Sequence, residues 1–205
     1  LRVEVHREGK VFEQEYSIGV PQYDVREIGT SDKTGTIVTF KPDDSIFLDT
    51  IYHYDILAAR LRELSFLNKG IHLSITDKRR TIEGTEDFVN EKFFSEGGLK
   101  EFVQFLDSTR DPILDDVIYV DGNKDNVPVE VAMIYNSSYS ENIHSYVNNI
   151  NTHEGGTHLA GFRRALTRTL KKYAESSGML DKVKFEISGD DFREGLTGVI
   201  SVKVM

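Results

Sequence analysis

The chain of 205 residues contains no cysteine and no apolar run long enough to cross a membrane. Without cysteine it forms neither disulfides nor thiolate metal sites, which is typical of a reducing cytoplasm, where we expect this protein to work. A membrane-spanning helix needs about 18 or more consecutive apolar residues, so we expect no membrane segment. The sequence begins at Leu1 without an initiator methionine or a signal peptide, and we therefore expect a piece of a longer protein.

One segment also lacks acidic residues, although the whole chain has a net charge of −9. Residues 155–174 contain neither Asp nor Glu, and their basic side chains are Arg163, Arg164, Arg168, Lys171 and Lys172. A helical stripe of apolar residues accompanies them, made of Leu159, Phe162, Leu166, Leu170 and Tyr173. At about 100° per residue, four of the basic side chains project from roughly the opposite side of this helix.

Arg163 differs from the other four because it lies at the edge of the apolar stripe. There it either pairs with a neighbouring element or points into a cavity. For the basic helix as a whole, two interpretations stay open: a solvated helix face, or a surface that contacts nucleic-acid phosphates without reading bases.

The rest of the sequence predicts a mixed chain of strands and helices. Alternating patterns predict strands at residues 3–16 (a hairpin around Gly9), 36–40, 71–75, 92–95, 117–120, 127–135, 143–147 and 198–204. Helical spacing predicts helices at residues 54–68, before a capping Gly70, and from residue 99 onward. The strands are too often adjacent for an alternating βαβ sheet, so we expect an α+β fold.

Two hydrophobic cores and one domain boundary are expected from these patterns. The charged segment 77–91 has few aliphatic residues and is the candidate boundary. The first core is expected around Leu57, Leu61, Leu64 and Leu67. The second is expected around Leu99, Phe102, Leu159, Phe162, Leu166 and Leu170.

No metal site is expected. His153 and His158 flank a Glu-Gly-Gly-Thr stretch, which resembles a zinc-protease motif in composition only. That motif needs its two histidines four residues apart on one helical face, whereas these are five apart with two glycines between them. The glycine pairs at 97–98 and 155–156 also lack the Lys-Ser/Thr of a phosphate-binding loop.

Seven motifs occur in order along nearly the whole chain. They are REGK at 7–10, KTGTIVTFKPD at 33–43, RLRELSFLNKG at 60–70, EGGLKEFV at 96–103, VEVAMIYN at 129–136, SENIHSYVNNINTHEGGTHLAGFRRALTRTL at 140–170 and GDDFREGLTGVISVKV at 189–204. With these motifs the chain resembles the B subunits of bacterial type II topoisomerases, and DNA gyrase most closely. The form RLRELSFLNKG favours gyrase over topoisomerase IV.

The resemblance implies two parts of an ATP-driven clamp. Residues 1–84 would be the C-terminal portion of an ATPase domain with the histidine-kinase-like fold. Residues 85–205 would be a transducer domain, a βαβ-rich two-layer sandwich like that of some ribosomal proteins. The implied activity is the ATP-dependent introduction of negative supercoils by passing one DNA duplex through another, in which this segment relays the nucleotide state and lines the DNA cavity.

The implied partners are DNA, the gyrase A subunit and a second B subunit in an A2B2 assembly. Two alternatives remain: the corresponding B-type subunit of topoisomerase IV, and a non-enzymatic nucleic-acid-binding module.

Individual roles also follow from the resemblance. Thr36 would reach the adenine end of ATP, Arg7 would line the mouth of the nucleotide pocket, and Arg163 would face the DNA cavity with the other basic residues of its helix. The family's catalytic glutamate, magnesium-binding asparagine and ATP lid are expected upstream of Leu1, and its γ-phosphate loop after Val204. We therefore expect ATP and Mg²⁺ in the intact subunit, but no catalytic residue, bound cofactor or ATPase activity in this chain alone.

Overall fold

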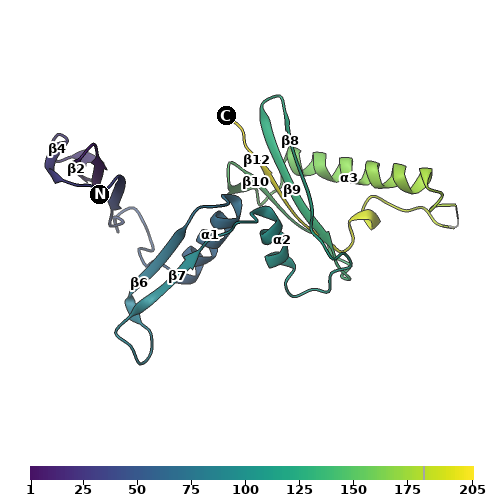
Figure 1. Cartoon of the computed structure of the whole chain (residues 1–205), viewed down its shortest axis with the longest axis horizontal. Helices are drawn as coiled ribbons and strands as arrows, with labels where there is room; N and C mark the ends of the chain where they lie inside the picture. Colours follow the sequence, from purple (N-terminus) through teal and green to yellow (C-terminus); the bar gives the residue numbers. More distant parts are fainter. Residues whose placement is uncertain (182) are drawn as a thin grey trace. The chain divides into compact units, whose positions relative to one another are not determined.

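In the computed structural model, which describes residues 1–181 and 183–205, the chain forms two compact units. The first, Leu1–His53, is built from strands, and the second, Tyr54–Met205, holds the α-helices of the described residues (Figure 1). None of the helices in the described part of the chain has the length and apolar character needed to cross a bilayer.

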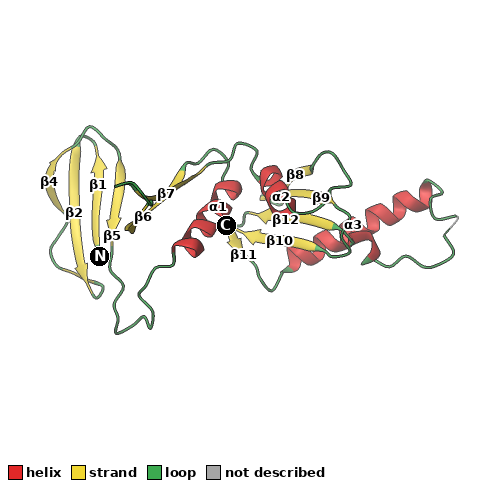
Figure 2. Cartoon of the chain, turned by 90° about the horizontal axis from the view of Figure 1, so that it is seen from below, coloured by secondary structure: helices red, strands yellow, loops and turns green. Residues whose placement is uncertain are grey.

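The first unit is a five-stranded sheet with the order β3-β2-β1-β5, in which β4 pairs with β2 (Figure 2). Its strands are β1 (Arg2–Arg7), β2 (Lys10–Ser17), β3 (Val20–Pro21), β4 (Arg26–Thr30) and β5 (Gly35–Thr39). The expected hairpin is confirmed: Arg7 pairs with Lys10, and Glu8 and Gly9 between them have φ values of 53° and 79°. A two-residue hairpin turn of this kind needs positive φ at both positions, which glycine adopts without strain.

A buried carboxylate ties the first unit together. The residue Glu13 is only 4% exposed. Its carboxylate accepts hydrogen bonds from Arg26 Nη2 at 2.8 Å, Tyr23 Oη at 2.8 Å and Arg2 Nε at 2.6 Å. These bonds, from Arg26 and Tyr23 above all, lower the pKa of Glu13 from 4.5 to about 2. The cluster therefore joins β1, β2 and the start of β4 through charge.

The second unit contains a five-stranded sheet with the order β11-β10-β12-β9-β8. Its elements are α1 (Tyr54–Leu67), β6 (Leu73–Thr81), β7 (Phe88–Phe93), α2 (Leu99–Asp107), β8 (Ile118–Lys124), β9 (Val127–Tyr135), β10 (Asn142–Val147), β11 (Ile150–Asn151), α3 (Thr157–Ser176), the 3₁₀ turn η1 (Asp191–Arg193) and β12 (Leu196–Val202). Strands β10 and β12 are parallel, and the connection between them contains α3. A parallel pair requires such a long crossover.

The charged segment 77–91 forms most of an antiparallel hairpin, β6–β7, paired from Leu73↔Phe93 to Thr81↔Phe88. Both strands extend further into this segment than the sequence pattern indicates. Asp77 is buried here because Arg79 Nε donates to its carboxylate at 2.8 Å, which lowers the pKa of Asp77 to about 2. Residue 84, near which the domain boundary is expected, lies in the turn of this hairpin and inside the second compact unit.

One hydrophobic core, rather than two, joins α1 and α2 to the sheet. Its buried members are Leu67, Leu99, Phe102, Val103, Ala132, Ile134, Tyr146 and Val199. Phe66 of α1 stacks on Phe102 of α2 with ring centroids 5.0 Å apart. The expectation of independent cores is therefore wrong, because Leu67 packs with Leu99 and Phe102, which are expected in the second core.

The expected phase of two helices also needs correction. In α1, Leu57 is 39% exposed, while Ala58 and Ser65 are buried, because small side chains let the helix approach its neighbours closely. Neither Leu61 nor Leu64 of this helix is fully buried. In α3, Leu159 is buried but Tyr173 is 61% exposed, and the neighbouring Ala174 is buried in its place.

A buried polar triad connects the C-terminal end of α2 with β9 and β12. Thr197 Oγ1 donates to Asp107 Oδ1 at 2.8 Å, and Asn136 Nδ2 donates to the same oxygen at 2.6 Å. All three residues are at most 6% exposed. The triad holds one end of the sheet in register with α2, since a buried carboxylate without donors would be strongly destabilising.

Candidate nucleic-acid interface

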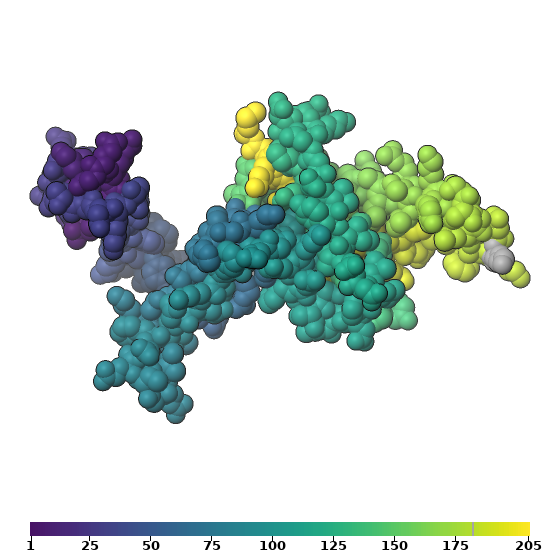
Figure 3. Space-filling model, in the orientation of Figure 1, coloured from purple at the N-terminus to yellow at the C-terminus, as the bar shows by residue number. Residues whose placement is uncertain are grey.

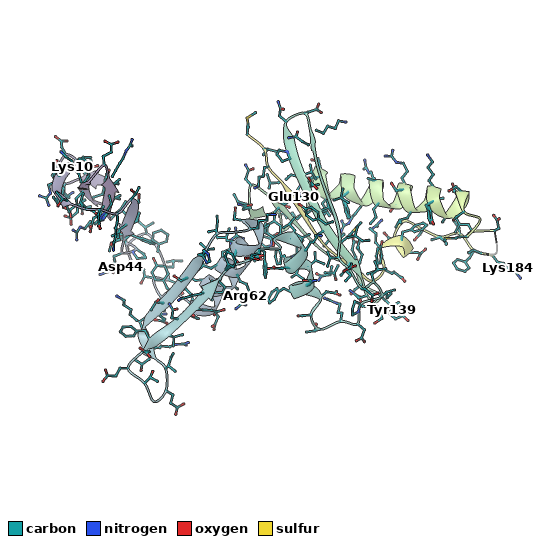
Figure 4. The ribbon with its side chains drawn as sticks, in the orientation of Figure 1. Lys10, Asp44, Arg62, Glu130, Tyr139 and Lys184 are labelled. Carbon is teal, nitrogen blue, oxygen red and sulfur yellow. The ribbon has the colours of Figure 1, made fainter. Side chains whose placement is uncertain are left out.

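Helix α3 begins after two glycines and presents its basic residues along one surface. Gly155 has a φ of +76°, which turns the chain out of the β10–β11 hairpin and into the helix. The buried residues of α3 are Leu159, near its start, and Ala174, near its end. Arg164, Arg168, Lys171 and Lys172 are exposed, whereas Phe162, Leu166 and Leu170 are partly buried (α3 is labelled in Figure 1; Figure 4 draws its side chains).

An open groove runs between α3 and the segment that precedes β12. The residues that line it are Ala160, Arg163, Arg164, Thr167, Arg168, Lys171, Gly189 and Arg193. Five of these eight residues are cationic. In the space-filling view, α3 and the turn η1 lie at the same end of the second unit (Figure 3). The groove therefore concentrates positive charge in a chain whose net charge is −9.

Arg193 is the most firmly held cation of the groove, with a side chain only 13% exposed. Its Nη1 donates to Thr167 Oγ1 at 2.9 Å and to the carbonyl of Gly189 at 2.7 Å, and its Nη2 pairs with Asp190. The hydroxyl of Tyr135 on β9 also donates to the carbonyl of Phe192 at 2.7 Å. The floor of the groove is therefore fixed to both α3 and the sheet.

Arg163 pairs with a neighbouring element, one of the two arrangements that its position at the edge of the stripe allows. Its Nε lies 2.8 Å from Oε1 of Glu141, the residue just before β10. The side chain of Arg163 remains 41% exposed and also lines the groove. An arginine in this setting is partly neutralised yet accessible to a second anion.

The other basic residues divide into two groups. Arg164, Arg168 and Lys171 line the groove, whereas Lys172 is exposed outside its lining. Sequence reasoning missed Arg193 and Glu141, although both lie in motifs that carry the resemblance. Their contribution depends on the chain folding back after α3, which no local pattern indicates.

The two residues assigned to a nucleotide lie in the first unit. Val5 pairs with Thr36 across β1 and β5, and Arg7 lies two residues beyond Val5 on β1. Directly paired residues share a face of a sheet, as do residues two apart, so Thr36 and Arg7 emerge on the same face. Thr36 is exposed, and Arg7, whose side chain is 72% exposed, pairs with Glu8 at 3.0 Å.

Thr36 and Arg7 place a hydroxyl and a guanidinium on one face of the sheet. A hydroxyl and a guanidinium supply hydrogen bonds, but they hold no metal. Among the residues that the structure describes, no three His, Cys, Asp or Glu side chains converge to hold an ion.

Comparison with known proteins places the chain in a family. Residues 98–205, slightly more than half of the 205 residues, match the family model described as DNA gyrase B. The chain belongs to the DNA gyrase B family. It is 64% identical over 200 residues to the DNA gyrase B protein of Eisenibacter elegans, covering 98% of this chain and 42% of that protein. The Staphylococcus aureus gyrase B protein is 47% identical over 204 residues, or 99% of this chain and 31% of its own length. The chain thus spans about two fifths or less of these gyrase B relatives.

Solved gyrase structures confirm the expected α+β fold. The 43K ATPase domain of Thermus thermophilus gyrase B, in complex with an aminocoumarin, matches with a TM-score of 0.83 at 35% identity, covering 100% of this chain and 54% of that one. The B subunit of the Myxococcus xanthus gyrase matches with a TM-score of 0.79 at 20% identity and covers 98% of this chain and 56% of that one. The second likeness concerns the fold alone.

Proposed function

We propose that this chain is the part of a DNA gyrase B protein that connects its ATPase site to the DNA-holding clamp. The observation that carries the proposal is the 64% identity to a gyrase B relative over 98% of the chain. Residues 1–84 form the C-terminal portion of the ATPase domain, and residues 85–205 form the transducer domain. Two contacts link these two proposed parts. Leu67 of α1 lies in the same hydrophobic core as Leu99 and Phe102, and strand β6 pairs with β7.

The groove along α3 contacts the DNA that passes through the clamp. Arg164, Arg168 and Lys171 follow one another along the helix over roughly 10 Å, at about 1.5 Å per residue. Phosphates of one DNA strand follow one another at about 3.4 Å along the DNA axis, so this stretch of α3 spans about three such steps. Long, exposed basic side chains favour phosphate contact over base recognition, which suits an enzyme that transports DNA of any sequence.

The first unit contributes the rim of the nucleotide site. Thr36 contacts the adenine end of ATP and Arg7 borders the opening, as their common face of the sheet allows. In the intact subunit ATP and Mg²⁺ supply the phosphoryl chemistry, and this chain's residues bind and orient the nucleotide. The working assembly contains DNA, the gyrase A subunit and a second B subunit in an A2B2 complex within the cytoplasm.

A plasmid assay tests this proposal. The full-length protein that carries this chain is mixed with its gyrase A partner, relaxed plasmid DNA, ATP and Mg²⁺. We expect negative supercoils that require ATP. Decatenation with relaxation but no supercoiling would instead identify a topoisomerase IV component, and DNA binding without ATP-dependent strand passage would identify a non-enzymatic module.

A further inference from the structure

The carboxylate of Glu141 lies beside Arg163 and Arg193 at the edge of the basic groove. Its Oε1 lies 2.8 Å from Arg163 Nε and 3.5 Å from Arg193 Nε. The Glu141 side chain is 24% exposed, so water and ions reach it. One carboxylate oxygen thus bridges two of the five cations that line the groove.

The two arginines are held very differently. Both terminal nitrogens of Arg193 are engaged by Thr167, Gly189 and Asp190. Its buried Nε has no hydrogen-bond partner in the described part of the chain and lies within ion-pair distance of Glu141. Arg163 is 41% exposed and makes its ion pair through Nε. Arg193 therefore stays in place, whereas Arg163 is able to turn toward the groove.

We infer that Glu141 is an internal competitor for the DNA phosphate that Arg163 binds. This inference rests on the proposed function, because it assumes that the groove receives DNA. A phosphodiester and the Glu141 carboxylate present similar oxygens to a guanidinium, and both fit its planar fork. A duplex that meets several cations at once displaces Glu141 from Arg163, while an isolated anion does not. The consequence is weak, reversible binding, as passage of a DNA segment requires.

A purely structural role for Glu141 makes the opposite prediction. If the ion pair served to fasten α3 to β10, its removal would loosen the groove and weaken DNA binding. If Glu141 acted through its net charge alone, its distance from Arg163 would not matter. Two substitutions separate these possibilities: Glu141→Gln removes the charge, and Glu141→Asp keeps the charge but withdraws it by one methylene group.

The test measures binding of the 205-residue chain to a short fluorescent DNA duplex by anisotropy over a range of salt concentrations. The matched control is Glu154→Gln, which makes the same charge change at an exposed residue before α3. Since exposed ion pairs contribute little, we expect Glu141→Gln to tighten binding about twofold to fivefold. We expect its log–log salt slope to steepen by up to about one unit. Glu141→Asp should also tighten DNA binding, and Glu154→Gln should tighten it by less than about twofold.

Three results would each overturn the inference. The first is an affinity of Glu141→Gln equal to that of Glu154→Gln. The second is weaker DNA binding by Glu141→Gln together with a lower melting temperature, and the third is binding by Glu141→Asp equal to that of the unchanged chain.

Arg163→Gln separates this inference from the proposed function. If Arg163→Gln lowers the salt slope but Glu141→Gln has no effect on DNA binding, then Glu141 is not a competitor, while the phosphate contact of Arg163 stands. An unchanged slope in Arg163→Gln rejects the phosphate contact itself.

Discussion

Replacing Phe102 with alanine should destabilise the whole second unit, including α1. Phe102 is 1% exposed and lies in the core between Phe66, whose ring centroid is 5.0 Å away, and Tyr146, at 6.0 Å. Deleting a buried phenylalanine ring removes its transfer free energy and leaves a cavity, at a cost of about 3–5 kcal/mol. Phe105→Ala on the same helix is the control, because Phe105 is 46% exposed and its loss should cost about 1 kcal/mol.

Urea unfolding followed by circular dichroism at a helix-sensitive wavelength measures this cost. The signal reports the second unit, which holds α1, α2 and α3. The double variant Phe66→Ala/Phe102→Ala then tests whether α1 and α2 share one core. Stacked aromatic pairs contribute about 0.5–1.5 kcal/mol beyond their buried area, so the two single costs should differ from additivity by that amount. Strict additivity, or a cost of Phe102→Ala below that of Phe105→Ala, would refute the single core.

Three further predictions concern the buried charges and the nucleotide site. The Glu13 carboxylate has its pKa lowered from 4.5 to about 2, so it stabilises the first unit above about pH 4.5 and this contribution is lost as the pH falls toward 2. NMR amide signals of β2, followed as the pH is lowered, measure this loss. We expect Glu13→Gln to abolish the pH dependence of these signals, and an unchanged titration in the variant would contradict the prediction. Thr197→Val should lower the unfolding free energy by about 1–3 kcal/mol, because Asp107 loses a buried donor, and a neutral effect in urea would argue against the triad. The chain alone should release no phosphate from ATP above background. ATP turnover above background that a substitution within the chain abolishes would contradict this prediction.

Sequence patterns predict several elements well because their signals are local. The hairpin around Gly9, the helix that begins at Leu99 and the strand at 127–135 each depend on short-range alternation or periodicity, and the structure has all three. The β6–β7 hairpin is harder to predict because its strands carry charge: Asp77 is buried by pairing with Arg79, a contact that a hydrophobicity pattern misses.

Helix phase and the candidate site depend on tertiary contacts. In α1 the buried positions include Ala58 and Ser65, whose small size matters only once a neighbouring element lies against them. In the groove, Arg164, Arg168 and Lys171 of α3 lie where helical periodicity suggests. Arg193 and Glu141 join them only because the chain returns after α3 to pair β12 with β10.

The salt dependence of DNA binding tests the central claim most directly. The double variant Arg164→Gln/Arg168→Gln removes two cations that line the groove, and Lys78→Gln/Lys92→Gln makes the same charge change on the exposed β6–β7 hairpin. Each lost phosphate contact reduces the slope of log Kobs against log salt by about one unit. We predict a slope lower by about two units for the groove variant, with the same loss of affinity on duplexes of different sequence, and little change for the hairpin variant. Equal slopes for the two variants would contradict a DNA-binding role for the groove along α3.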